Sequence, residues 1–143
     1  ATDKMKMLNA NTVTPEDKIL VGTVFDGLFQ SLNNRDENGL MNSFSPLIAK
    51  FLGKANATRS DVVTFMHKIY KSDVASMNWM SLEDYAITKK EVGDQQYEYT
   101  VVFSGLQKVE HTDNSSSETR FRFNAKVNPD GRITELNMTK ILE

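Results

Sequence analysis

The residues with the greatest scope for chemistry lie on a strand-like stretch in the middle of the chain, where two acids interrupt a run of apolar positions. Glu83 is in phase with Trp79 and Tyr85, and Asp84 is in phase with Leu82, so one carboxylate turns toward the apolar side in either register. Burial there would raise its pKa and suit it to general acid/base catalysis. A bulge that breaks the phase would leave both acids in solvent, and we favour this alternative because carboxylates are rarely fully buried.

Two histidines are the other ionisable candidates. His67 lies at the edge of the apolar stripe of a predicted helix, beside Val63 and Tyr70, where it could act as a general base. We favour a boundary histidine bonded to backbone or water, and we expect His111, next to a polar turn, to be exposed. The histidines are far apart and near no paired carboxylates, so no metal-ligand spacing appears. We therefore assign no catalytic residue and no metal site, and keep as candidates only Glu83, Asp84 and His67.

Aromatic and apolar residues on the predicted strands could line a ligand cavity. The predicted ligand-pocket residues are Trp79, Tyr97, Tyr99, Phe121, Phe123 and Met138. The same side chains could instead fill the interior as core, because the inward positions of a curved sheet must be packed. We favour a packed core over an open pocket.

Three helices are predicted to position these residues. Thr14 can cap a first helix that has Pro15 in its first turn and apolar residues at three- and four-residue spacing, from Ile19 and Leu20 to Leu32. We expect this helix to end near positions 33–34. Asp36 predicts a cap for a short second helix over 37–42. A third helix follows Thr58 and ends near 71–73.

After the third helix the period of the apolar residues changes from 3.6 to 2, which predicts antiparallel strands. Gly93-Asp94 is a hairpin signal, Gly105 predicts a bulge or sharp bend, and Asn128-Pro129-Asp130-Gly131 predicts a type I turn. A short strand is expected within 44–52. The long strands are expected over 79–92, 97–104, 119–127 and 132–142. The sequence therefore predicts an α+β fold in which N-terminal helices pack on a strongly curved, mainly antiparallel sheet.

Composition excludes several classes of function. The chain has 143 residues, the usual size of one domain, and its hydrophobic fraction of 39% is typical of a globular protein. Its 17 basic and 19 acidic residues are interleaved without a basic block, so we predict no nucleic-acid partner. No stretch approaches the roughly 20 apolar residues that span a bilayer. The absence of cysteine excludes disulfides, thiolate metal sites and cysteine nucleophiles. We predict no cofactor.

The beginning of the chain differs from the rest. Positions 1–13 are polar and unpatterned, and we expect a flexible N-terminal segment there followed by a single domain over 14–143. The chain starts at Ala1 without an initiator methionine, which favours a trimmed or processed chain. We expect an exported bacterial protein, periplasmic or secreted, although a cytoplasmic location stays open.

The order helix, short helix, strand, helix and long antiparallel strands resembles the nuclear transport factor 2-like family, also described as SnoaL-like or cystatin-like. The local resemblance lies in Phe44-Ser45-Pro46, Phe51-Leu52-Gly53, Asn56-Ala57-Thr58, Asp61-Val62-Val63, Trp79 and Asp130-Gly131-Arg132-Ile133. It covers positions 14–142 and is closest to small exported bacterial members.

The resemblance implies a cone-shaped α+β fold but no single function, because the family includes isomerases, dehydratases, hydrolases and many non-enzymatic domains. Our leading hypothesis is a non-enzymatic domain that binds a small apolar ligand or a protein partner. The alternative is a small-molecule isomerase, dehydratase or hydrolase that uses a pocket carboxylate as acid/base. The resemblance also implies a weak homodimer through the face of the sheet turned away from the helices, where we place Glu98, Thr100, Val102, Arg120, Arg122 and Asn124.

Overall fold

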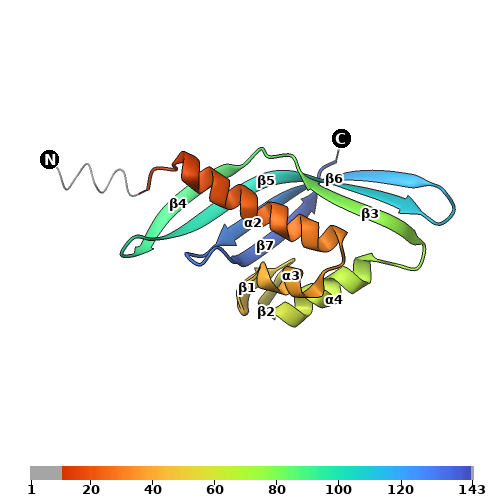
Figure 1. Cartoon of the computed structure of the whole chain (residues 1–143), viewed down its shortest axis with the longest axis horizontal. Coiled ribbons are helices and arrows are strands. Elements are labelled where there is room, and N and C mark those ends of the chain that lie inside the picture. The colour runs from red at the N-terminus through yellow and green to blue at the C-terminus, as the bar shows by residue number, and fades with distance from the viewer. Residues whose placement is uncertain (1–10, 143) are drawn as a thin grey trace.

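A computed structural model describes residues 11–142, so positions 1–10 of the predicted N-terminal segment lie outside the described residues. The elements in chain order are α2 (Pro15–Asn33), α3 (Glu37–Asn42), β1 (Leu47–Phe51), β2 (Lys54–Thr58), α4 (Arg59–Ile69), β3 (Val74–Ser81), β4 (Ala86–Gly93), β5 (Gln96–His111), β6 (Ser116–Val127) and β7 (Ile133–Lys140) (Figure 1). None of the helices in this part of the chain is long and apolar enough to cross a membrane.

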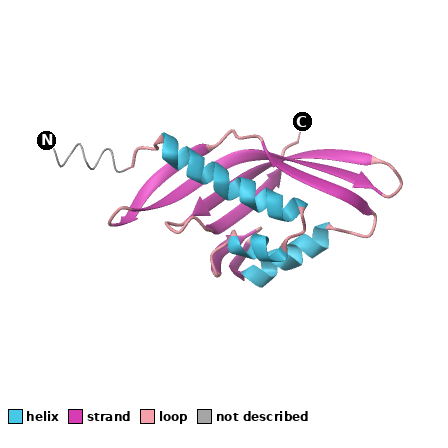
Figure 2. Ribbon diagram, in the orientation of Figure 1, coloured by secondary structure: helices cyan, strands magenta, loops and turns pink. Residues whose placement is uncertain are grey.

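The strands form one sheet in the order β2-β1-β7-β6-β5-β3, and β4 also pairs with β5. Every pairing is antiparallel except that of β1 with β7. The long strand β5 pairs with β4 through its first half and with β3 through its second half. Helix α2 runs across one face of the sheet, and α3 and α4 lie beside β1 and β2 (Figure 2). The fold is therefore α+β, as the sequence predicted.

Local capping explains where the helices begin. The backbone N–H of Asp17 donates to Thr14 Oγ1 at 3.1 Å, and the N–H of Thr14 donates to Asp17 Oδ2 at 2.8 Å, which closes a capping box. At α3, the N–H of Gly39 donates to Asp36 Oδ1 at 3.0 Å. At α4, the N–H of Thr58 donates to Asp61 Oδ2 at 2.8 Å. All three predicted helices are confirmed.

Aromatic rings form the centre of the core between α2 and the sheet. The Phe25 and Phe103 ring centroids are 4.5 Å apart, Phe103 stacks on Phe123 at 5.0 Å, and Phe29 meets Phe123 at 5.5 Å. Phe121 is only half-buried and packs at the edge of this group. Ring pairs at these separations add to the stabilisation that burial of their apolar area supplies.

One strand prediction was wrong, and one strand was not predicted. The stretch 79–92 is not one strand, because residues 82–85 leave the sheet between β3 and β4 at the point where β5 exchanges one partner for the other. The N–H of Leu82 donates to the carbonyl of Ser104 at 2.9 Å, which ties this loop to β5. The short strand predicted within 44–52 is confirmed as β1, but its hairpin partner β2 was not predicted; the turn between them places both Leu52 and Gly53 at positive φ.

Gly105 has a different role from the predicted bulge or bend. The register between β5 and β6 is continuous there, with Gly105 opposite Phe121. A Cβ atom at this position would lie 2.6 Å from Phe123 Cε2. The glycine therefore allows the Phe123 ring to approach the backbone of β5 closely.

The buried face of α2 also differs from the predicted one. Asp17, Val21, Phe25, Leu28 and Leu32 are buried at three- and four-residue spacing. Ile19 and Leu20, which we had placed on this face, are 69% and 40% exposed. Both side chains lie to one side of the stripe that contacts the sheet.

Candidate functional site

A small apolar cavity lies in the interior between the helices and the sheet. Its volume is about 20 Å³, close to what one water molecule occupies, and every lining side chain is apolar. Trp79, Phe123 and Met138 are on this lining, together with Phe29 of α2. The rings leave too little space for a substrate.

Only half of the predicted ligand-pocket residues meet at this cavity. Trp79, Phe123 and Met138 line it, and Phe121 contacts Trp79 with 5.6 Å between ring centroids without lining it. Tyr97 and Tyr99 lie at the other end of the sheet, beside Lys89. The sequence could not separate the two groups, because all six residues share the inward phase of their strands.

The two candidate acids lie in the loop between β3 and β4, and both residues are exposed. Glu83 adopts a positive φ of 60°. The Asp84 carboxylate accepts the N–H of Ser104 at 2.6 Å. Partial burial acts to raise the pKa of Asp84, but the hydrogen bond from Ser104 and the nearby charge of Arg122 lower it below its ordinary value. A general acid at neutral pH requires the opposite shift.

Each histidine lies beside a carboxylate; His67 is exposed, whereas His111, which we expected to be exposed, is half-buried. His67 Nε2 is 2.6 Å from Glu37 Oε1, and both side chains are largely exposed. His111 Nδ1 is 3.5 Å from Asp73 Oδ2. Within residues 11–142, no group of three or more metal-ligating side chains is placed to hold a metal ion.

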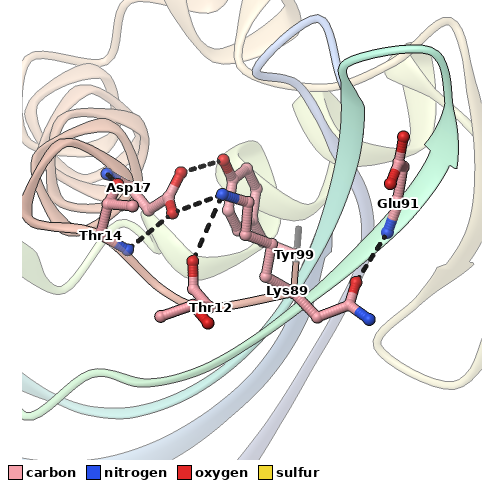
Figure 3. Close-up of polar contacts among 7 residues, drawn as sticks. Thr12, Thr14, Asp17, Lys89, Glu91 and Tyr99 are labelled. Carbon is pink, nitrogen blue, oxygen red and sulfur yellow. Dashed lines mark hydrogen bonds and ion pairs between the residues drawn. The ribbon is translucent and has the colours of Figure 1, made fainter. Parts of the chain in front are cut away.

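The structure reveals a buried polar cluster that we did not predict, which we call the Asp17 cluster: Asp17, Lys89 and Tyr99. Tyr99 Oη donates to Asp17 Oδ1 at 2.5 Å, and Lys89 Nζ donates to Asp17 Oδ2 at 2.9 Å (Figure 3). The Asp17 residue and the Lys89 side chain are each only 8% exposed. The cluster joins the first turn of α2 to β4 and β5.

Residues just before α2 cover the Lys89 ammonium group. Lys89 Nζ donates to the carbonyl oxygen of Thr12 at 3.4 Å and lies 4.1 Å from the centroid of the Tyr97 ring. The N–H of Glu91 donates to Asn11 Oδ1 at 3.3 Å, so residues 11–13 lie beside β4 (Figure 3). Across the described residues no buried side-chain nitrogen or oxygen lacks a hydrogen-bond partner.

The cluster has strongly shifted pKa values. Burial acts to raise the pKa of Asp17, but hydrogen bonds from Tyr99, the Thr14 backbone and Lys89 outweigh it and lower the pKa to about 2. Burial and the neighbouring carboxylate raise the pKa of Tyr99. At neutral pH Asp17 is therefore ionised and Tyr99 keeps its proton. Each group of the cluster has a partner within it, and these contacts connect the first turn of α2 to β4 and β5.

A sequence signal for this cluster existed. Asp17 precedes Val21 by four positions and Phe25 by eight, which places it on the buried stripe of α2. Lys89 is in phase with Ile87, and Tyr99 is in phase with Val101. Asp17 also lies in the first turn of α2, where the helix dipole favours a carboxylate wherever the side chain points.

The lowered pKa of Asp17 predicts how stability responds to acid. The carboxyl group would titrate near 3.8 in the unfolded chain and titrates at about 2 in the folded one. Its contribution is therefore present above about pH 4 and is lost as the pH falls toward 2, a loss of about 2 kcal/mol. Denaturant unfolding of the wild type and of Asp17→Asn between pH 6 and pH 2 measures this loss of stability. Asp17→Asn should show the shallower pH dependence.

Asp26→Asn is the matched control, because Asp26 is an exposed carboxylate on the same helix. It should keep the pH dependence of the wild type. Equal pH dependence in the wild type and Asp17→Asn would contradict the assignment.

Comparisons with known proteins identify the fold. No protein-family model matches the sequence, and no curated protein matches it. Among solved structures, a nuclear transport factor 2-like superfamily protein from Salmonella enterica aligns with a TM-score of 0.70 at 12% identity, over 88% of this chain and 92% of that one. A protein of unknown function from Burkholderia pseudomallei, described as having the same type of fold, aligns with a TM-score of 0.62 at 14% identity, over 85% and 91%.

An enzyme with this architecture is also similar. The hexachlorocyclohexane dehydrochlorinase LinA-type3 from Novosphingobium barchaimii aligns with a TM-score of 0.65 at 10% identity, over 83% of this chain and 82% of that one. Identities this low establish the fold alone. The chain has the nuclear transport factor 2-like fold, as the sequence resemblance implied, and its structural neighbours include both enzymes and proteins of unknown function.

Proposed function

We propose that this chain is a non-enzymatic protein-interaction domain that self-associates through the outer face of its sheet. The observation that carries the proposal is the filled interior. Its cavity of about 20 Å³ is lined by apolar side chains alone, so no ionisable group borders it. The acid/base alternative requires a carboxylate in such a pocket, whereas Glu83 and Asp84 are exposed.

The outer sheet face, as we use the term, consists of the residues whose side chains point away from α2. Met80 is opposite Leu106, and Leu106 is opposite Arg120. Val102 lies on β5 with Leu106, and the N–H of Leu82 donates to the carbonyl of Ser104 between them. We call these four residues the apolar strip: Met80, Leu82, Val102 and Leu106. Met80 and Leu82 are among the exposed large hydrophobic residues of the protein. Exposed apolar side chains next to one another are typical of interaction surfaces.

Charges of both signs surround this strip. Arg122 is opposite Ser104, Lys108 is opposite Glu118, and Lys126 is opposite Glu135. A second copy, turned by a twofold axis, can set basic side chains against acidic ones around a shared apolar centre. We therefore commit to a second copy of this chain as the partner, in a modest dimer.

Sedimentation tests this proposal. We expect a dimer with a dissociation constant in the micromolar range that weakens in high salt, because exposed ion pairs are screened. Met80→Glu should weaken the dimer roughly tenfold or more, since it places charge on the apolar strip. Leu47→Glu is the control, because Leu47 is also apolar and is more exposed than Met80, at 78% against 39%, but lies on β1. A dimer unaffected by both salt and Met80→Glu would refute the proposal.

Binding of a small apolar ligand is a second candidate. The favouring observation is the apolar cavity itself, whose lining includes the half-buried side chains of Leu52, Phe65 and Met138. Methionine is flexible enough to move aside for a ligand. A rise in the unfolding temperature of the wild type with benzene would favour this candidate, and an unchanged temperature would favour the interaction domain.

A further inference from the structure

A groove runs along α2 on the side where the sequence had predicted burial. It lies between α2 and the segments at the end of α3 and before β7, and has a volume of about 570 Å³. Its lining on the helix consists of Glu16, Ile19, Leu20, Thr23, Val24 and Gly27. Ile19 and Leu20 are 69% and 40% exposed. The groove is separate from the outer sheet face, because α2 covers the opposite face of the sheet (Figure 2).

No contact within residues 11–142 explains the glycine at position 27. Glycine inside a helix destabilises it relative to alanine, because the backbone loses more conformational freedom on folding. A Cβ atom at position 27 would meet no atom within 4 Å. By contrast, Gly131 on the other wall has a positive φ of 78° that favours glycine. The space beside Gly27 is therefore open, and a glycine there allows another backbone to approach α2 closely.

The charges of the groove indicate what can enter it. Among the described residues, ten line the groove; Glu16 and Asp130 are acidic and none of the ten is basic. The lining also includes the neutral polar residues Thr23, Asn42 and Ser43. The two carboxylates beside Ile19, Leu20 and Val24 complement a segment that carries apolar side chains on one face and lysine or arginine beside them. Glu16 to Gly27 spans about 17 Å of helix, enough for about three turns of a helical partner.

We infer that this groove, defined by Glu16, Ile19, Leu20, Val24, Gly27 and Asp130, binds a basic amphipathic helix of another protein. Apolar side chains of that helix contact Ile19, Leu20 and Val24, its backbone approaches Gly27, and its basic side chains pair with Glu16 and Asp130. The inference rests on the proposed function in that it treats the chain as an interaction domain, but it assigns a different face and a different partner.

A labelled amphipathic peptide of leucine and lysine, with leucine at helical spacing, is a suitable probe. Fluorescence anisotropy with the full chain should show saturable binding that weakens with salt. A matched peptide with glutamate in place of every lysine should bind at least tenfold more weakly. Ile19→Ser should weaken binding of the basic peptide roughly tenfold, whereas Leu47→Ser, at a residue 78% exposed on β1, should leave it unchanged.

The Gly27→Ala variant tests whether the glycine at position 27 serves peptide binding or only the stability of α2. The new methyl group should raise the midpoint of thermal unfolding by about 3 °C while weakening peptide binding roughly tenfold. The two effects have opposite signs, so impaired folding cannot imitate them.

Four outcomes would overturn the inference: no saturable binding, equal binding of the acidic peptide, binding unaffected by Ile19→Ser, or a lower unfolding temperature in Gly27→Ala. Self-association abolished by Ile19→Ser would also overturn it, because a second copy would then cover the groove. Met80→Glu should leave peptide binding intact, so failure of the outer-face dimer and failure of this inference are distinguishable.

Discussion

Lys89→Ala is expected to lower the free energy of unfolding by about 3–5 kcal/mol at neutral pH, because it leaves the ionised Asp17 buried without its counter-charge. The ammonium and carboxylate groups are 2.9 Å apart, and neither side chain is more than 10% exposed. Loss of the ammonium group also removes the donor to Thr12 and the cation over the Tyr97 ring. Denaturant unfolding followed by circular dichroism measures the change.

Lys90→Ala is the matched control for this experiment. Lys90 is the next residue on β4 and is exposed, so its loss should change stability by less than about 0.5 kcal/mol. Removing both charges, as in Asp17→Asn with Lys89→Met, should restore part of the stability, because the unpaired buried charge is then absent and the amide oxygen introduced at position 17 can still accept a hydrogen bond. A loss below about 1 kcal/mol in Lys89→Ala would mean that water reaches the carboxylate.

Phe123→Ala is expected to cost about 3–5 kcal/mol, the usual loss when a large aromatic residue is truncated in a packed core. Phe123 is buried and contacts the rings of Phe29, Trp79 and Phe103. It also borders the existing cavity, so its removal should enlarge that cavity rather than open a new one. Benzene should then raise the unfolding temperature of the variant, because an enlarged apolar cavity binds apolar ligands.

Phe121→Ala is the comparison for this second prediction. Phe121 is two residues along the same strand but only half-buried, so its truncation should cost distinctly less. Equal losses in the two variants, or a Phe123→Ala protein that benzene does not stabilise, would contradict the packing described above.

The helices could be predicted from sequence because their signals are local. The capping box at the start of α2 involves only Thr14 and Asp17, and the cap of α4 involves only Thr58 and Asp61. Hydrogen bonds between residues three positions apart depend little on the rest of the fold. The same holds for the turn before β7, where the N–H of Gly131 donates to the carbonyl oxygen of Asn128.

The strand boundaries were harder because distant pairing decides them. The break at 82–85 follows from β5, which pairs with β4 up to Val102 and with β3 from Gly105 onward. The separate strand β2 exists because the chain reverses at Leu52 and Gly53. An alternation of apolar and polar residues indicates a strand but not the point at which its neighbour changes.

By itself, the sequence determined the α+β class, the three helices and the inward phase of the aromatic residues, because caps and periodicity act over a few positions. Only the tertiary structure decided that the rings fill the interior and that Ile19 and Leu20 stay exposed. It also decided that Asp17 meets Lys89 and Tyr99, which are 72 and 82 positions away. The physical reason is that burial and ion pairing depend on which surfaces meet after folding, and such contacts leave only a weak trace in local sequence patterns.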